Sequence, residues 1–252
     1  MELGIQVIGA LFAPGTEKHG FFRAIRRMGY TAAEICVSMV PFPGAEHAIW
    51  PIENCADGMA AIGEAGLKCS SCHVFTDDPE ADAEKLARFS ERYGVRNFVL
   101  KSPKELTEQS VTQAAEKYVS AAELLTDAGA ELWLHNEARD IAAKLGGRTA
   151  YEYLLDLCAG RLFAQADVGW VLAGGEDPAA LLTRNAGRVK SVHYKDHDGT
   201  KETPIGQGRV DLPFCARFAR DRGCAGIVDM DSYPNGFEKD AVSAFNVLTA
   251  VR

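Results

Sequence analysis

The sequence predicts a single (β/α)₈ barrel, the TIM-barrel architecture, over residues 1–252. Short apolar, β-rich runs recur about every 32 residues, which is the size of one βα unit. Amphipathic segments, with apolar residues three or four positions apart, lie between these runs. Eight such units in 252 residues match this barrel in both count and length. The runs begin near Leu3, Thr31, Leu67, Arg96, Ala130, Arg161, Arg188 and Ala225.

The segments between the runs carry the marks of helix starts and ends. Residues 17–28 and 107–127 each place their apolar side chains on one side of a helix. Asp78-Pro79 and Asp177-Pro178 combine an N-cap residue with a proline in the first turn. No strand leads into a GxGxxG turn, which disfavours a doubly wound dinucleotide-binding sheet. Glycines that accept the left-handed conformation end four of the expected helices: Gly29, Gly66, Gly94 and Gly129.

Composition and charge narrow the class of protein. Hydrophobic residues make up 47% of the chain, enough to form a core and too many for a disordered protein. Lys and Arg number 27 against 35 Asp and Glu, a net charge of −8, which disfavours a general nucleic-acid binder. No run approaches the roughly 18 apolar residues of a membrane span, and no secretory signal is evident. We therefore expect a cytoplasmic protein that binds a small molecule. The sequence leaves open whether the protein forms a homo-oligomer.

The seven cysteines are scattered, which does not suggest a disulfide framework. Cys69 and Cys72 form a CxxC sequence, the pattern of some redox and zinc sites. They lie in an apolar run that is expected to be a strand, and strand alternation predicts that they point to opposite faces. The sequence therefore favours buried, unpaired thiols.

Ionisable residues end nearly every expected strand. In a barrel of this kind the catalytic groups project from the C-terminal ends of the strands. Residues two apart share a face of a strand, so the last four strands can direct carboxylates and imidazoles to one point. Several acids in one cavity repel one another unless a cation is present, and mixed carboxylate and imidazole ligands suit Mn²⁺, Zn²⁺, Co²⁺ or Fe²⁺. The pairs expected to share a face are His135 with Glu137, His193 with Lys195, and Asp229 with Asp231.

Five strings carry a resemblance to a known family. They read LHNE at 134–137, ADVGW at 166–170, VHYKD at 192–196, PIGQGRVD at 204–211 and VDMD at 228–231. With them the chain resembles the sugar phosphate isomerase/epimerase family of xylose isomerase-like TIM barrels, over essentially its whole length. The resemblance implies a divalent metal held by an acid after strand five, Asp after strand six, His after strand seven and an acid after strand eight.

Carried over to this chain, the implied metal ligands are Glu137, Asp167, His193 and Asp229. Strand five departs from the family pattern, because the order His135-Asn136-Glu137 leaves His135 as the alternative ligand and Glu137 as a base. Strand eight departs as well, since Asp229 is one methylene shorter than the usual glutamate. Mn²⁺ is the expected metal, with Zn²⁺, Co²⁺ or Fe²⁺ as alternatives.

The predicted chemistry is isomerisation or epimerisation of a sugar or keto-sugar, by proton abstraction through an enediolate. A metal would act as the Lewis acid, while a carboxylate or imidazole moves the proton. We assign the proton transfer to His135 and to one of Glu137 or Asp229, and expect Lys195 to stabilise a substrate oxygen. The expected substrate-binding residues are His73, Lys101, Trp170 and Arg209.

Two alternatives stay open. The same proton abstraction serves a dehydratase or lyase on an inosose or a 3-keto-glycoside. A non-catalytic sugar-binding barrel with a degraded metal site would also explain the departures at strands five and eight. An endonuclease is disfavoured, because it needs more histidines than the six present and a cationic groove.

Overall fold

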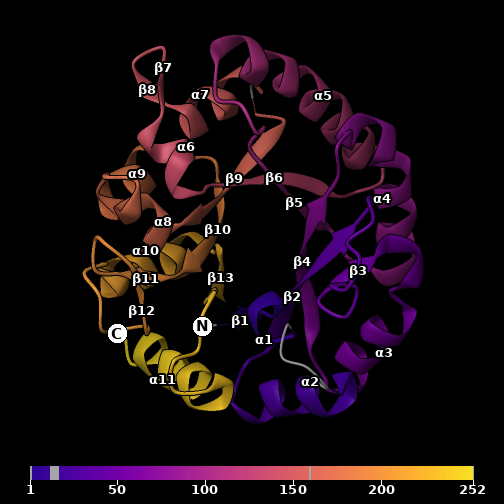
Figure 1. Ribbon diagram of the computed structural model, residues 1–252, viewed down its shortest axis with the longest axis vertical. Coiled ribbons are helices and arrows are strands. Elements are labelled where there is room, and N and C mark those ends of the chain that lie inside the picture. The colour runs from indigo at the N-terminus through magenta and orange to yellow at the C-terminus, as the bar shows by residue number, and fades with distance from the viewer. Residues whose placement is uncertain (1, 12–16, 159, 252) are drawn as a thin grey trace.

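Eight parallel strands close a barrel, as the sequence predicts (Figure 1). The computed structural model describes residues 2–11, 17–158 and 160–251. The strand order is β1-β13-β10-β9-β6-β5-β4-β2, and pairing of β1 with β2 closes the ring. The barrel strands are β1 (Leu3–Gln6), β2 (Ala32–Ser38), β4 (Lys68–Phe75), β5 (Asn97–Lys101), β6 (Glu131–His135), β9 (Leu162–Asp167), β10 (Val189–Tyr194) and β13 (Ala225–Val228).

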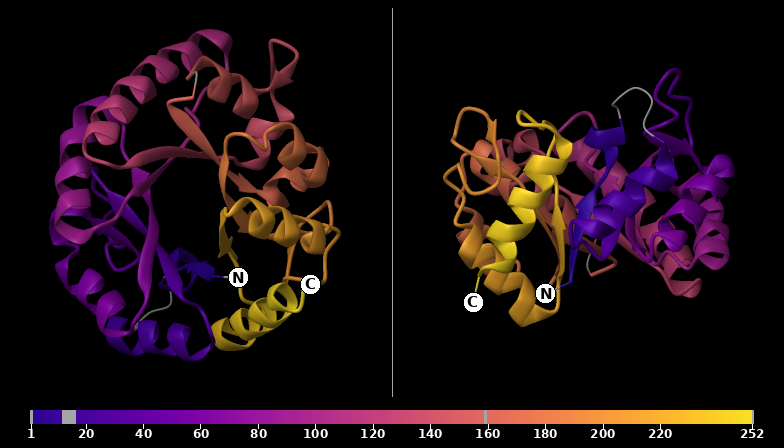
Figure 2. Two further views of the ribbon diagram at one scale, coloured as in Figure 1. Left: turned by 180° about the vertical axis from the view of Figure 1, so that it is seen from behind. Right: turned by 90° about the horizontal axis from the view of Figure 1, so that it is seen from below.

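Helices surround the barrel, and its two sides differ (Figures 1 and 2). The side of β4 and β5 is covered by the long helices α4 and α5, whereas the side of β6, β9 and β10 carries short helices and two small hairpins. The helices are α1 (Ile8–Leu11), α2 (Lys18–Arg27), α3 (Ala56–Glu64), α4 (Pro79–Tyr93), α5 (Glu108–Asp127), α6 (Ala138–Ala142), α7 (Ala150–Leu157), α8 (Val168–Ala173), α9 (Pro178–Arg184), α10 (Leu212–Arg222) and α11 (Phe237–Thr249). The remaining elements are β3 (Ile49–Pro51), a 3₁₀ turn (Ile52–Asn54), and the hairpins β7 (Lys144–Leu145) with β8 (Arg148–Thr149) and β11 (Asp196–His197) with β12 (Glu202–Thr203).

The expected helix caps are confirmed. Asp78 and Asp177 cap α4 and α9 through their side chains, with a proline in the first turn of each helix. Thr107 begins α5 in a reciprocal pair of hydrogen bonds with Ser110. Gly94 ends α4 at φ 72°, a conformation that glycine adopts without strain. Short-range sequence signals therefore define where these helices begin and end.

Polar burial is concentrated at the C-terminal ends of the strands. Apolar side chains of the strands and of the inner helix faces pack into one core. Against that apolar background, seven buried acidic, histidine or lysine residues lie in or directly after barrel strands: Glu34, His73, His135, Asp167, His193, Lys195 and Asp229. Burial of so many polar groups needs compensating hydrogen bonds, ion pairs or a bound ion, because each group loses its hydration.

The expectation for Cys69 and Cys72 is wrong in one respect. Their Sγ atoms lie 3.8 Å apart, so they do not point to opposite faces. The register between β2 and β4 shifts after Cys69, and this irregularity interrupts the alternation of side chains. Both are free thiols, and Cys72 is buried as expected.

No helix among the described residues is both long and apolar enough to span a membrane.

Candidate functional site

Four buried side chains meet at the mouth of the barrel, and we call them the four-residue cluster: His135, Asp167, His193 and Asp229. His135 and Asp167 are the last residues of β6 and β9, His193 lies near the end of β10, and Asp229 directly follows β13. Each offers one nitrogen or oxygen atom, and these four atoms lie within 4.8 Å of one another. Two imidazoles and two carboxylates at this separation form a ligand set suited to a divalent transition metal.

Two sets of hydrogen bonds hold Asp167 in place, one to its backbone and one to its side chain. The Asn136 side chain accepts a hydrogen bond from the Asp167 amide at 2.9 Å and donates one to the Asp167 carbonyl at 3.1 Å, which joins the ends of β6 and β9. Oδ1 of Asp167 accepts the Trp170 amide at 2.8 Å and so caps α8. Oδ2 is buried without a hydrogen-bond partner among the described residues. This carboxylate is therefore fixed in place with one oxygen free to bind a ligand.

Glu34 in β2 is a fully buried carboxylate beside the cluster. Its Oε2 accepts hydrogen bonds from Ser71 Oγ at 2.5 Å and from Gln165 Nε2 at 2.7 Å. Its Oε1 lies 2.8 Å from His193 Nε2 and 3.0 Å from His73 Nε2. Oε1 and His193 Nε2 nonetheless lack a well-aligned hydrogen-bond partner within the described part of the chain. Glu34 thus links two histidines from opposite walls of the barrel.

Lys195 is a fully buried cation beside the cluster. Its Nζ lies 3.4 Å from Asp229 Oδ2 and 3.1 Å from Asp231 Oδ2. The ammonium also lies over the Trp170 ring, 5.2 Å from its centre. A Cβ atom at Gly169 would lie 2.7 Å from Lys195 Cβ, so only glycine lets the lysine pass so close to α8. Lys195 therefore orients Asp229 and contributes positive charge at the mouth.

Neighbouring charges control protonation on one side of the cluster. Burial alone would lower the pKa of His193, but the carboxylates of Glu34 and Asp229 raise it to about 10. Burial would raise the pKa of Asp229, yet Lys195 and His193 hold it well below its ordinary value. Burial would also raise the pKa of Glu34, and His193 and His73 hold it low. These groups form a connected network of opposite charges.

Desolvation controls protonation on the other side. Burial, helped by the positive charge of His193, lowers the pKa of His135 well below its ordinary value. Burial raises the pKa of Asp167 well above its ordinary value, because Lys195 and His193 only partly offset the loss of hydration. A neutral imidazole and an under-compensated carboxylate are the states that a cation would stabilise.

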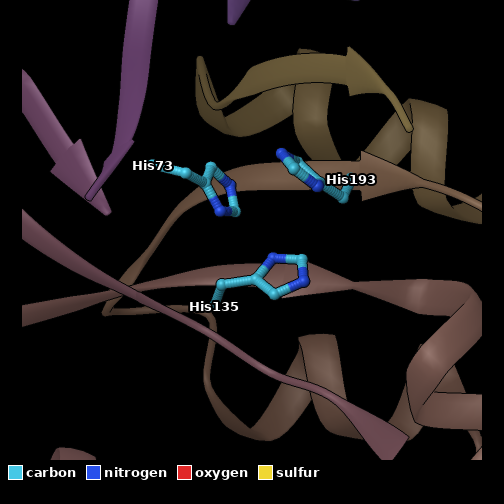
Figure 3. Close-up of side chains that lie close together, drawn as sticks. All are labelled: His73, His135 and His193. Carbon is cyan, nitrogen blue, oxygen red and sulfur yellow. The ribbon is translucent and has the colours of Figure 1, made fainter. Parts of the chain in front are cut away.

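Three imidazoles lie close together, and we call them the three-histidine cluster: His73, His135 and His193 (Figure 3). Their ring centroids are 5.0 to 5.5 Å apart. One ring nitrogen of each lies within 4.8 Å of the others. Figure 3 shows the rings arriving from three different strands and facing a shared space.

The structure does not bring Glu137 into the four-residue cluster. β6 ends at His135, and Glu137 becomes the N-cap of α6, so strand alternation no longer applies to it. Its carboxylate is half-buried and lies 2.6 Å from Lys101 Nζ, while Arg139 Nε donates to it at 3.2 Å. His135, the alternative ligand in the sequence analysis, occupies the fourth position instead.

The predicted substrate-binding residues are distributed unevenly around the cluster. His73 lies within the buried network, and Trp170 is half-buried beside Lys195. Lys101 is at the exposed end of β5, in register with His135. Arg209 is exposed in the loop after β12, and its guanidinium lies 3.4 Å from the Asp198 carbonyl oxygen. His73, Trp170 and Lys101 therefore surround the mouth of the barrel, whereas the Arg209 side chain contacts the backbone at Asp198.

The KD and GQG strings have a structural role in this loop. The Asp196 carboxylate accepts the amides of Gly206, Gly208 and Val210 at 2.9, 2.8 and 3.3 Å. A Cβ at Gly208 would overlap the Asp196 carboxylate, so glycine is required there. Asp196 consequently orders the loop, whereas the neighbouring Lys195 pairs with Asp229 and Asp231.

Sequence reasoning missed Glu34 and Gln165. Both are polar residues between apolar neighbours inside a strand, Ala33-Glu34-Ile35 and Ala164-Gln165-Ala166. Gln165 Oε1 lies 2.9 Å from His73 Nε2 and 3.2 Å from His135 Nδ1. A lone polar residue in an apolar barrel strand was the available indication, because both faces of such a strand are buried and a polar side chain there has to pair with other polar groups in the barrel interior.

Comparison with known proteins agrees with this architecture. The family model of the xylose isomerase-like TIM barrel matches residues 22–248, so the chain belongs to that family. No curated protein is significantly similar in sequence. Among solved structures, a sugar phosphate isomerase/epimerase from Parabacteroides distasonis aligns with a TM-score of 0.81 at 20% identity, covering 99% of this chain and 95% of that one.

Two further solved structures show the range of activities on this fold. A 3-keto-D-glucoside 4-epimerase from E. coli aligns with a TM-score of 0.75 at 16% identity, covering 99% of both chains. A probable 3-DHS dehydratase from Bacillus anthracis aligns with the same TM-score at 12% identity, again covering 99% of both chains. At these identities the similarity establishes the fold.

Proposed function

We propose that the protein is a divalent-metal-dependent isomerase or epimerase of a sugar or keto-sugar. The four-residue cluster carries this proposal, because two buried imidazoles and two buried carboxylates converge within 4.8 Å at the catalytic end of the barrel. Family membership supports it, as do the epimerases among proteins of the same fold.

The four residues fit a divalent metal. Asp167 Oδ2 is buried and without a hydrogen-bond partner among the described residues, which is costly unless a ligand completes it. His135, His193 and Asp229 would supply the other three donor atoms. When bound, the metal supplies a Lewis acid that polarises a substrate oxygen, and Mn²⁺ suits this mixture of nitrogen and oxygen donors.

With the imidazole of His135 among the ligands, we assign the proton transfer to Asp229, which would bind the metal through one carboxylate oxygen and transfer the proton through the other, and to Glu137, which lies outside the cluster. These residues follow β13 and β6, which are separated in the barrel by β10 and β9, so they approach a ligand in the mouth from different directions. Lys195 holds the Asp229 carboxylate at 3.4 Å, and Lys101 holds that of Glu137 at 2.6 Å. A base on each side of a carbon is what inversion of its configuration requires, and a placed base contributes about 10²–10⁴-fold.

The surrounding residues would bind the substrate. Trp170 presents an aromatic face beside Lys195, on which the apolar face of a sugar ring can stack. Lys195 would stabilise the negative oxygen of the enediolate, and Lys101 and His73 lie on the opposite wall of the mouth. Arg209 would contact the substrate only from the loop after β12.

Solvent-deuterium exchange tests the proposal. Full-length protein is incubated in D₂O with ketoses, inososes and keto-glycosides, with and without Mn²⁺, and the products are followed by NMR and mass spectrometry. We expect Mn²⁺-dependent deuterium at a single carbon of one substrate class. Exchange accompanied by loss of water would identify a dehydratase or lyase. Absence of exchange together with no stoichiometric metal after reconstitution would contradict the proposal and favour a sugar-binding barrel.

A further inference from the structure

The three-histidine cluster and the four-residue cluster share two members but differ in chemistry. His135 and His193 belong to both. The first cluster adds the imidazole of His73, while the second adds the carboxylates of Asp167 and Asp229. Nitrogen-rich sites favour Zn²⁺, whereas carboxylate oxygens favour Mn²⁺. The proposed isomerase chemistry gives no function to a third imidazole at the centre of the barrel.

Two observations indicate a ligand at the three-histidine cluster. All three rings are at least 95% buried, and one nitrogen of each lies within 4.8 Å of the others, which is the separation of ligands around one cation. In addition, His193 Nε2 and Glu34 Oε1 lie 2.8 Å apart without a well-aligned hydrogen bond in the described part of the chain, and Oε1 also lies 3.0 Å from His73 Nε2. A buried imidazole nitrogen and a buried carboxylate oxygen that lack well-aligned hydrogen bonds are groups that a cation would stabilise.

Charge supports the same interpretation. The Glu34 carboxylate is 3.0 Å from His73 Nε2 and 2.8 Å from His193 Nε2, so it supplies negative charge beside the imidazoles. Gln165 fixes two of the rings, since its Oε1 lies 2.9 Å from His73 Nε2 and 3.2 Å from His135 Nδ1. Carboxylate and amide groups that orient ligating histidines are common around zinc.

We propose that His73, His135 and His193 form a second cation position that prefers Zn²⁺, with Glu34 as its counter-charge. Because His135 and His193 serve both positions, one cation at a time is bound. Zn²⁺ at the three-histidine cluster therefore displaces Mn²⁺ from the four-residue cluster and opposes the proposed activity. The second position itself does not depend on which reaction the protein catalyses.

A matched pair of variants tests the two positions separately. Metal-free, full-length wild type, His73→Asn and Asp167→Asn are titrated with Zn²⁺ against a chromophoric chelator, and with Mn²⁺ by electron paramagnetic resonance of the free ion. We expect His73→Asn to weaken Zn²⁺ binding by more than about 100-fold and Mn²⁺ binding by less than about threefold. Asp167→Asn is expected to do the reverse, and Zn²⁺ is expected to release Mn²⁺ from wild type.

Wild-type protein provides a readout that needs no variant. X-ray absorption of the zinc-loaded protein is expected to show three imidazole ligands at about 2.0–2.1 Å. Two imidazoles, or equal weakening of both metals by both variants, would overturn the second position and leave one shared site. Absence of Mn²⁺ binding with zinc binding intact would contradict the proposed function and not this inference.

Discussion

Two buried carboxylates in this molecule have opposite surroundings. Glu152 in α7 belongs to what we call the Glu152 network, with Thr149, Arg184 and Asn185. Its Oε1 accepts from Arg184 Nε at 2.7 Å and Asn185 Nδ2 at 2.9 Å, and its Oε2 accepts from Thr149 Oγ1 at 2.8 Å and Arg184 Nη2 at 3.1 Å. Asp167 has one oxygen that caps a helix and another with no hydrogen-bond partner in the described chain.

This difference in hydrogen bonding indicates that Glu152 contributes to the stability of the fold, whereas Asp167 is suited to binding a ligand. A carboxylate whose oxygens are all satisfied stabilises the fold, because its donors replace the lost water. A buried carboxylate with an unsatisfied oxygen costs folding free energy and persists where a ligand uses it. Carboxyl-to-amide substitutions at the two positions should therefore have opposite consequences.

The largest effect is expected for Asp167→Asn. Mn²⁺ affinity should fall by more than about 100-fold, because the amide is a poor ligand for the cation. The free energy of unfolding of the metal-free protein should stay unchanged or rise, since Asn still accepts the Trp170 amide and no longer buries an uncompensated carboxylate. Metal titration and urea unfolding measure both quantities, and destabilisation beyond about 1 kcal/mol would contradict the comparison.

Glu152→Gln should give the opposite result. In the variant an NH₂ group replaces one of the two carboxylate oxygens that accept hydrogen bonds from Arg184 and Asn185. Because one acceptor is lost, the free energy of unfolding should fall by about 2 kcal/mol. Mn²⁺ affinity should be that of wild type, because the Glu152 network lies outside both clusters. An unchanged urea midpoint, or weaker Mn²⁺ binding in a folded variant, would refute this expectation.

The pH dependence of this loss sharpens the comparison. Burial would raise the pKa of Glu152, but hydrogen bonds from Arg184 and Asn185 lower it to about 2. A lowered pKa in the folded state means that the stabilisation is complete above the ordinary value of about 4.5 and is lost as the pH falls toward 2. The difference between wild type and Glu152→Gln should therefore shrink below pH 4.5, as urea unfolding at a series of pH values would show.

The smallest effect on folding and on metal binding is expected for Glu137→Gln. Its pairing with Lys101 is partly exposed and contributes about 0.5 kcal/mol or less. Mn²⁺ affinity should change by less than about twofold, whereas turnover should fall about 10²-fold if Glu137 carries a proton. Wild-type turnover with metal bound would remove Glu137 from the mechanism.

The sequence predicts the barrel because its signals are local. The 32-residue spacing, the N-caps at Asp78 and Asp177 and the glycine at position 94 need no knowledge of distant contacts. Two strand ends, His135 and Asp167, could be located in the same way.

The remaining features depend on relations between strands. Glu137 lies outside the four-residue cluster because α6 begins at the end of β6, and Cys69 approaches Cys72 because of a register irregularity between two strands. The contact of Glu34 with His193 depends on the tilt and stagger of a closed barrel, which a single strand does not encode.

The two oxygens of Asp167 have a practical consequence. Oδ1 fixes the first turn of α8 and Oδ2 has no hydrogen-bond partner among the described residues, so a cation bound to this carboxylate would be joined through it to the helix that carries Trp170. The indole lies beside the Lys195 ammonium, and we expect its fluorescence to change when a cation binds.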